Sequence, residues 1–150
     1  MNLKELLESF DAQGKNFTEL HDILQAKKNA LITNNLDELD EALKKEQTLL
    51  SNIDKEDKKR KNLVAALATE NSVDLRENSM DDLFNSLKGF PKSEIEKLRK
   101  IRSNLKQKAG EVIHVNSQLS VMIDVSRGIV KETMVSLLGK GNKKIVNKRV

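Results

Sequence analysis

The sequence predicts an all-α protein: an antiparallel bundle of three long helices plus one short helix, with a long C-terminal helix and a basic tail. Two observations support this fold class. The 150 residues include one proline and six glycines, too few for the frequent turns of a β-sandwich. Leucine, isoleucine and phenylalanine also recur with the period of an amphipathic helix. The length suits one modest domain.

The first helix is expected over residues 2 to 33. At 1.5 Å per residue it is roughly 45 Å long. Asn34 and Asn35 end its pattern, so a short turn should follow. Its apolar stripe recurs every seven residues and consists of Leu3, Phe10, Phe17, Leu24 and Leu31.

The second helix is expected over residues 36 to 68. Asn35, with Glu38 three residues later, has the spacing of an N-cap, in which a short polar side chain accepts a hydrogen bond from a free backbone N–H. The two helices should pack as a hairpin. The stripe of the second one contains Leu36, Leu39, Leu43, Leu50, Ile53, Val64 and Leu67.

Residues 54 to 62, within the second helix, contain no apolar side chain. The favoured interpretation is a solvated surface with ion pairs four residues apart, such as Glu56 with Arg60. The alternative is a specific docking patch.

Residues 69 to 79 have the composition of a loop. Ser79 is expected to cap a short helix, and Gly89 to provide a left-handed residue at its C-terminal end before Pro91. The apolar residues of this helix are Met80, Leu83, Phe84 and Leu87.

The last helix is predicted to be the longest. Ser93 and Glu96 have the spacing of a capping box, and the helix period then continues for about 45 residues, roughly 65 to 70 Å. After residue 112 the apolar residues spread beyond one narrow stripe, which is typical of a partner surface. The alternative is that the short helix, the loop or a second copy of the chain covers this face. The residues outside the narrow stripe are Val112, Ile113, Val115, Val121, Val125, Met134 and Val135.

The basic character of the chain is concentrated at its C-terminal end. The net charge is +4, and residues 139 to 150 carry five positive charges and no acid, which leaves the first 138 residues at −1. We therefore expect a helical domain over 1–138 and a flexible basic tail over 139–150 that solubilises the chain or binds an acidic partner. The tail lacks aromatic residues that stack on bases, so no nucleic-acid partner is expected.

No enzyme class fits the remaining chemistry. The chain has no cysteine, which excludes thiol nucleophiles and zinc sites built on sulfur. Glu111 and His114 have the Glu-x-x-His spacing of di-iron bundles, but a second such pair and two further glutamates are missing. The segment from Gly139 lacks the spacing of a phosphate-binding loop. We expect no catalytic residue, no cofactor and no metal.

The N-terminus lacks the pattern of a secretion signal, and no segment approaches the roughly 18 apolar residues that a membrane span needs. A cytoplasmic protein without stable membrane insertion is therefore expected.

Four segments are similar to a known family. They are Ala30-Leu-Ile-Thr-Asn-Asn-Leu-Asp-Glu-Leu39, Glu46-Gln-Thr-Leu-Leu50, Asp81-Asp-Leu-Phe-Asn-Ser-Leu87 and Val115-Asn-Ser-Gln-Leu-Ser120. In these segments, and in its layout over about residues 3 to 138, the chain resembles the FlgN-type flagellar export chaperones.

The resemblance implies a cytoplasmic, non-catalytic chaperone. Such a protein holds hook-associated (hook-filament junction) proteins before secretion and delivers them to the membrane export gate, with its C-terminal helix as the client-binding part. The resemblance places the client face at Asn116, Leu119, Met122, Ile123, Ile129, Val130, Met134, Leu137 and Leu138. The alternative function is a structural adaptor that self-associates through the 112–138 face, and a homodimer is left open.

Overall fold

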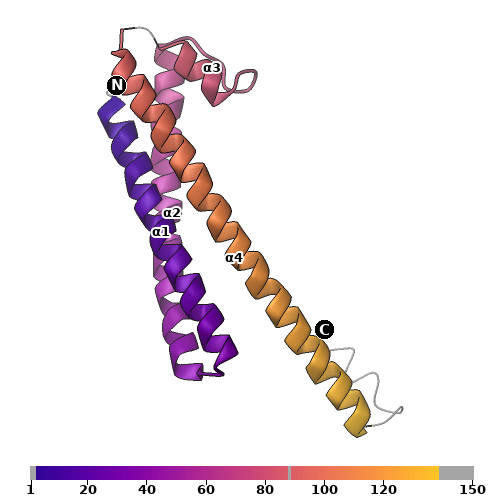
Figure 1. Cartoon of the computed structure of the whole chain (residues 1–150). Helices are drawn as coiled ribbons and strands as arrows, with labels where there is room; N and C mark the ends of the chain where they lie inside the picture. Colours follow the sequence, from indigo (N-terminus) through magenta and orange to yellow (C-terminus); the bar gives the residue numbers. More distant parts are fainter. Residues whose placement is uncertain (1–2, 88, 139–150) are drawn as a thin grey trace. The chain divides into compact units, whose positions relative to one another are not determined.

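The computed structural model describes residues 3–87 and 89–138 and contains four α-helices in this part of the chain (Figure 1). They are α1 (Leu3–Ile32), α2 (Leu36–Glu70), α3 (Met80–Asn85) and α4 (Lys92–Leu138). The prediction of an all-α protein with three long helices and one short helix is confirmed for the described residues. No helix among them is long and apolar enough to cross a membrane.

The chain divides into two compact units, residues 1–112 and residues 113–150. The first unit holds α1, α2, α3 and the first part of α4, and the second holds the remainder of α4. The predicted basic tail, from Gly139 onward, lies outside the described residues, so the predicted domain boundary at 138 stays a prediction.

Helices α1 and α2 pack side by side along their length (Figure 1). In their connection, Asn34 takes a left-handed backbone conformation with φ 55°, which asparagine tolerates better than most residues. The side chain of Asn35 accepts a hydrogen bond of 3.1 Å from the backbone N–H of Glu38, so the predicted N-cap is confirmed. Farther along the pair, Lys27 Nζ lies 3.1 Å from Glu46 Oε2.

The hydrophobic core of the first unit joins its four helical segments. Leu6, Leu67 and Leu98 are less than 2% exposed, and burying a leucine side chain contributes about 1.5–3 kcal/mol. Gln13, which is 2% exposed, donates a hydrogen bond of 3.1 Å to the carbonyl of Ile53, which offsets the cost of burying its amide. The buried core residues are Leu3, Leu6, Phe10, Val64, Leu67, Ala68, Leu83, Phe84, Leu87, Leu98 and Leu105.

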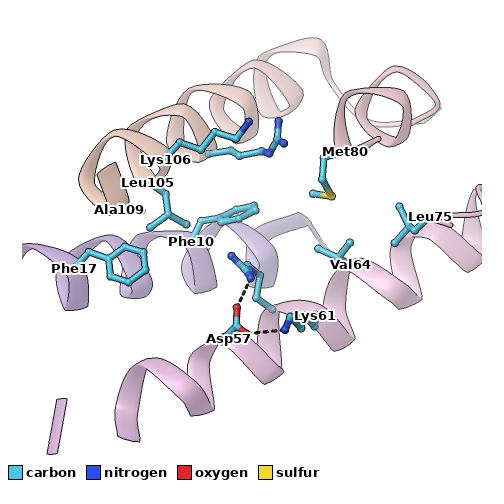
Figure 2. A pocket seen from close by; sticks show the side chains of 12 residues that line it. Phe10, Phe17, Asp57, Lys61, Val64, Leu75, Met80, Leu105, Lys106 and Ala109 are labelled. Atoms are coloured by element: carbon cyan, nitrogen blue, oxygen red, sulfur yellow. Dashed lines mark hydrogen bonds and ion pairs between the residues drawn. The ribbon is translucent and has the colours of Figure 1, made fainter. Parts of the chain in front are cut away.

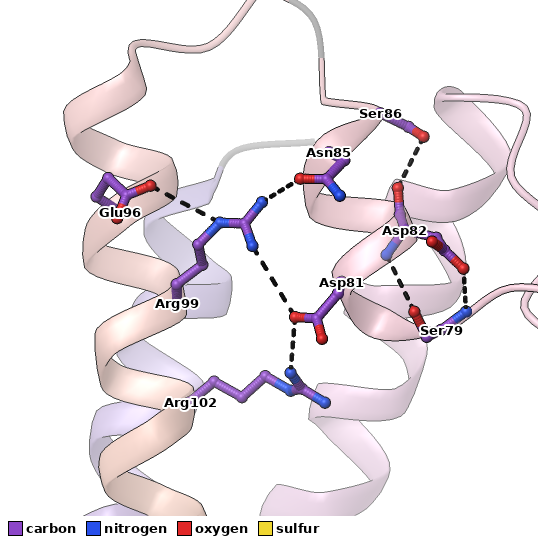
Figure 3. A network of polar contacts seen from close by, with 8 residues as sticks. All are labelled: Ser79, Asp81, Asp82, Asn85, Ser86, Glu96, Arg99 and Arg102. Atoms are coloured by element: carbon purple, nitrogen blue, oxygen red, sulfur yellow. Dashed lines mark hydrogen bonds and ion pairs between the residues drawn. The ribbon is translucent and has the colours of Figure 1, made fainter.

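Helix α3 is short, and its N-terminus is capped in both directions. The Ser79 hydroxyl accepts from the backbone N–H of Asp82 at 3.1 Å, and the Asp82 carboxylate accepts from the backbone N–H of Ser79 at 2.9 Å (Figure 3). The predicted cap at Ser79 is confirmed. Because an isolated helix of this length is unstable in water, α3 depends on packing against its neighbours.

Two arginines of α4 fasten α3 to it. The guanidinium groups of Arg99 and Arg102 lie 5.8 and 5.9 Å from the centre of the Phe84 ring, within the range of a cation–π contact. Arg102 Nη1 lies 3.3 Å from Asp81 Oδ1, and Arg99 donates to Asn85 Oδ1 (Figure 3). These contacts explain why a helix of six residues is held in place.

The expected capping box at Ser93 and Glu96 is wrong. Helix α4 begins at Lys92, and the carbonyl of Pro91 accepts from the backbone N–H of Glu94 at 3.0 Å. Since Pro91 supplies the first acceptor, Ser93 already lies inside the helix and cannot cap it.

The expected role of Gly89 is also corrected. Helix α3 ends at Asn85 with Ser86 as its C-cap, so Gly89 does not end the helix. Gly89 does have a left-handed φ of 85°, and it uses this conformation in the connection to α4.

Candidate functional site

The candidate partner-binding surface lies on the second unit, where α4 runs from residue 113 to Leu138. This segment is about 39 Å long at 1.5 Å per residue. Six large apolar side chains between Val121 and Leu137 are at least 36% exposed. Exposed apolar surface of this extent on one helix is typical of a protein interaction site.

Five apolar residues make up what we call the α4 stripe: Ile123, Val130, Met134 and Leu137 share one side of the helix, and Met122 lies at the edge of that side, in nearly the same direction as Ile129. Residues seven apart differ in direction by only about 20° on a straight helix. Ile123, Val130 and Leu137 therefore form a continuous row, and their exposed fractions are 36%, 57% and 78%. Met122 and Met134 flank the row and are half-buried.

The other four residues of the expected client face have different surroundings. Leu119 is only 2% exposed, so in the free chain its side chain is not accessible to a partner. Asn116 is exposed, and so are Ile129 at 59% and Leu138 at 42%. At about 100° per residue, the side chain of Ile129 does not point in the same direction as those of Ile123 and Val130. The assignment of these residues to client binding stays a prediction.

A second apolar row joins Ile129, which is among the expected client residues, to Val121 and Val125, which are not. Val121, Val125 and Ile129 are spaced four apart and are 61%, 56% and 59% exposed. Their β-branched side chains were the sequence signal, because they broaden the apolar content after residue 112. Val121 and Val125 point away from Ile123 and Val130, so these two pairs provide opposite test surfaces on one helix.

A polar side lies between the two apolar rows on one side of the helix, whereas on the other side the rows adjoin at Met122 and Ile129. Asp124, Arg127 and Lys131 lie three and four residues apart, and therefore on a common side. The amphipathic arrangement lets a partner helix pack against an apolar row while the charged side remains hydrated.

The Glu-x-x-His pair of Glu111 and His114 lies on an exposed part of α4. His114 is exposed, and its Nε2 atom lies 3.3 Å from Gln118 Nε2. Across residues 3–87 and 89–138, no group of three or more histidine, aspartate or glutamate side chains could hold a metal ion.

Comparison with protein-family models matches residues 1–147 to the family described as FlgN protein. The comparisons with curated proteins and with solved structures gave no match. The family match covers nearly the whole chain and includes the α4 stripe.

Proposed function

The chain belongs to the FlgN family, and we propose that it binds hook-associated proteins through the α4 stripe before their export. Family membership supports the general role, a chaperone in flagellar assembly. The client class, the binding residues and the delivery of the client to the export gate, in the cytoplasm, are our proposal.

The observation that carries the proposal is the exposed row of Ile123, Val130 and Leu137. Hook-associated proteins pass the export channel unfolded, and their terminal helices pair only in the assembled structure. In the cytoplasm such helices present an apolar face. A second helix with a complementary apolar row can cover that face by packing alone and release it without breaking a covalent bond.

The two methionines of the α4 stripe suit this task. Methionine is unbranched and polarizable, so it adapts to partner surfaces of different shape. Met122 and Met134 lie at the two edges of the row. A chaperone that serves more than one hook-associated client would benefit from such adaptable contacts.

The test is to replace Ile123 and Val130 together by glutamate. We expect affinity for a hook-associated client to fall by at least a hundredfold, because each buried carboxylate must lose its hydration without a partner. Both side chains are exposed, so helix content by circular dichroism should stay near wild type. Leu119 is unsuitable for this test because it is buried.

The matched control is Val121→Glu with Val125→Glu. It adds the same charge to the same helix on the opposite side, and we expect client affinity within about threefold of wild type. Equal loss in both double variants, or retained binding in Ile123→Glu with Val130→Glu, would contradict the proposed binding row.

A structural adaptor is the second candidate function. The observation that favours it is the second apolar row of Val121, Val125 and Ile129, which gives α4 enough apolar surface to pack against another copy. An adaptor forms a stable homo-oligomer without a client, and the Val121→Glu, Val125→Glu control would then dissociate it. The chaperone proposal expects light scattering to give a monomer, or a weak dimer, for both proteins.

A further inference from the structure

The first unit contains a cavity of about 700 Å³ that is separate from the α4 stripe (Figure 2). It lies among α1, α2, the connection before α3, α3 itself and the part of α4 before residue 112. Its volume falls within the range of ligand-binding pockets in proteins. The cavity contributes nothing to the client-binding row, so its shape and charge call for a separate explanation.

The interior of the cavity is apolar. Phe10, which is 3% exposed, and Leu105, which is 6% exposed, line it. Leu75, in the connection before α3, is 37% exposed at its edge. An exposed leucine beside an apolar hollow is a contact that a partner side chain could complete. The uncharged lining residues are Phe10, Phe17, Val64, Leu75, Met80, Leu105 and Ala109.

Positive charge lines both sides of the cavity. Arg60 and Lys61 come from α2, and Arg102 and Lys106 come from α4. Figure 2 shows Lys61 and Lys106 on opposite sides of the apolar side chains. Among the described residues that line the cavity, Asp57 is the one with a carboxylate. The lining therefore carries a surplus of cations.

The existing ion pairs do not remove this surplus. Asp57 contacts both Arg60 and Lys61, and Arg102 contacts Asp81. Lys106 is exposed and makes no hydrogen bond or ion pair with the described residues. The cavity therefore has an apolar centre and a positively charged rim, and a complementary ligand has an apolar centre and negative flanks.

The predicted pair of Glu56 with Arg60 is wrong, and the reason bears on this site. Glu56 Oε1 is buried without a hydrogen-bond partner among the described residues, whereas Arg60 pairs with Asp57 and lies 6.0 Å from the centre of the Phe10 ring. Three residues of the charged stretch over residues 54 to 62 thus line the cavity, namely Asp57, Arg60 and Lys61. This arrangement favours the docking patch over a wholly solvated surface.

We propose that this cavity binds an acidic amphipathic segment of a partner protein, with an apolar side chain in its apolar interior and carboxylates on both flanks. Arg102 and Lys106 are one helical turn apart, about 6 Å along the axis. Two carboxylates one turn apart on a partner helix match this spacing. Lys61 contacts a carboxylate on the opposite flank of the same segment.

The distribution of the cations favours a polypeptide over a fatty acid. A fatty acid has one carboxylate at one end, and its site needs cations at one end only. Here the cations lie on two helices on opposite sides of the apolar centre. A polypeptide carries several carboxylates and can satisfy both sides at once.

The experiment selects binders from a random peptide library displayed on phage, with the full-length protein as bait. We expect enriched peptides to carry an apolar residue with acidic residues on both sides. Synthetic copies should bind wild type at least tenfold more tightly than Lys106→Glu or Leu75→Ser. Both changes are at exposed positions, so the fold should be retained.

The matched control is Lys100→Glu, which makes the same charge change at an exposed position of α4 outside the cavity lining. We expect its peptide affinity to stay within about twofold of wild type, because opposite charges interact mainly over short distances in salt solution. Equal weakening in Lys100→Glu and Lys106→Glu would overturn the proposal, since it would show a general effect of net charge.

Methyl NMR of ¹³C-labelled methionine locates the binding directly. Met80 lines the cavity, whereas Met122 and Met134 belong to the α4 stripe. The acidic peptide should shift the Met80 signal and leave the other two in place. Three results would each overturn the proposal. The first is that the selected peptides shift only the signals of Met122 and Met134, and the second is that the selection enriches no acidic peptides. The third is that dodecanoate shifts the Met80 signal but no peptide does. The outcome is independent of the client-binding test, because the two sites report through different methionines.

Discussion

Asp57 is a carboxylate of α2 that contacts two cations of the same helix. It accepts from Lys61 at 2.9 Å and also contacts Arg60, and its side chain is 31% exposed. The hydrogen bond from Lys61, followed by the charge of Arg60, lowers the pKa of Asp57 below its ordinary value of 3.8, although burial opposes the shift. The folded chain therefore holds this carboxylate in its charged form more strongly than the unfolded chain does.

Asp57→Asn should lower the free energy of unfolding at pH 7 by up to about 1 kcal/mol. Because the folded pKa is depressed, the stabilisation is present above about pH 4 and is lost as the pH falls through the folded value. Wild type and variant should therefore converge at pH 2 to 3. Urea unfolding at the two pH values measures this.

Asp54→Asn is the control for this prediction, since Asp54 pairs with Lys58 but both side chains are mostly exposed. A smaller effect than that of Asp57→Asn is expected. A difference between wild type and Asp57→Asn that persists at pH 2 would show that the amide acts through packing and not through charge.

Phe84 holds α3 against α4. The ring is 1% exposed and lies beneath the guanidinium groups of Arg99 and Arg102. Phe84→Ala should lower the free energy of unfolding by about 3 to 5 kcal/mol through the lost transfer energy and the cavity that remains. Urea unfolding measures the loss. A change below about 1 kcal/mol would mean that α3 contributes little to the core.

Glycine limits the continuity of α4 at two positions. Gly110 and Gly128 lie inside the helix, and a Cβ atom added at either position meets no heavy atom within 4 Å. Glycine inside a helix costs about 0.5 to 1 kcal/mol relative to alanine. Gly128 therefore makes the half of α4 that we propose to bind the client less stable than its apolar pattern alone would suggest.

Gly128→Ala should strengthen the second unit. We expect slower amide hydrogen exchange over residues 121 to 135, by a factor of about 2 to 5, which corresponds to 0.5 to 1 kcal/mol. Gly89→Ala is the contrasting variant, because its φ of 85° penalises alanine whatever the space around it. Faster amide exchange in Gly128→Ala would contradict this prediction, because it would show that the glycine is needed for a close packing contact and does not merely lower the stability of the helix.

The helices could be predicted from the sequence because their signals are local. Leu3, Phe10 and Phe17 recur every seven residues, and each cap, at Asn35 and at Ser79, involves residues three apart. All of these signals lie within one or a few helical turns. The start of α4 could not be placed in this way, because Pro91 and Ser93 compete for the first position and the local spacing favoured the wrong one.

Features that depend on packing between helices could not be predicted from the sequence. The contact of Arg60 with Phe10 joins α2 to α1, and the cavity needs residues from all four helices. Nothing in the charged stretch over residues 54 to 62 shows which of its side chains point to another helix. Leu119 is a further case, since the helix period places it on the apolar face but does not show that it is buried.

The molecule as a whole combines a packed unit with an exposed helical segment. In the first unit Leu6, Leu67 and Leu98 are buried in the core, whereas in the second unit Val130 and Leu137 remain exposed on α4. Exposed apolar surface risks self-association unless a partner covers it. In the two candidate functions this surface has different uses: the proposed client packs on the row of Ile123, Val130 and Leu137, and a second copy of the chain packs on the row of Val121, Val125 and Ile129.

The most direct measurement is light scattering of the purified chain alone and mixed with a hook-associated protein from its own source cells. The chaperone account expects the chain alone to scatter as a monomer or weak dimer, and the mixture to give a complex of one chain with one client. A stable dimer or larger oligomer that takes up no client would contradict the account and assign the exposed face of α4 to self-association.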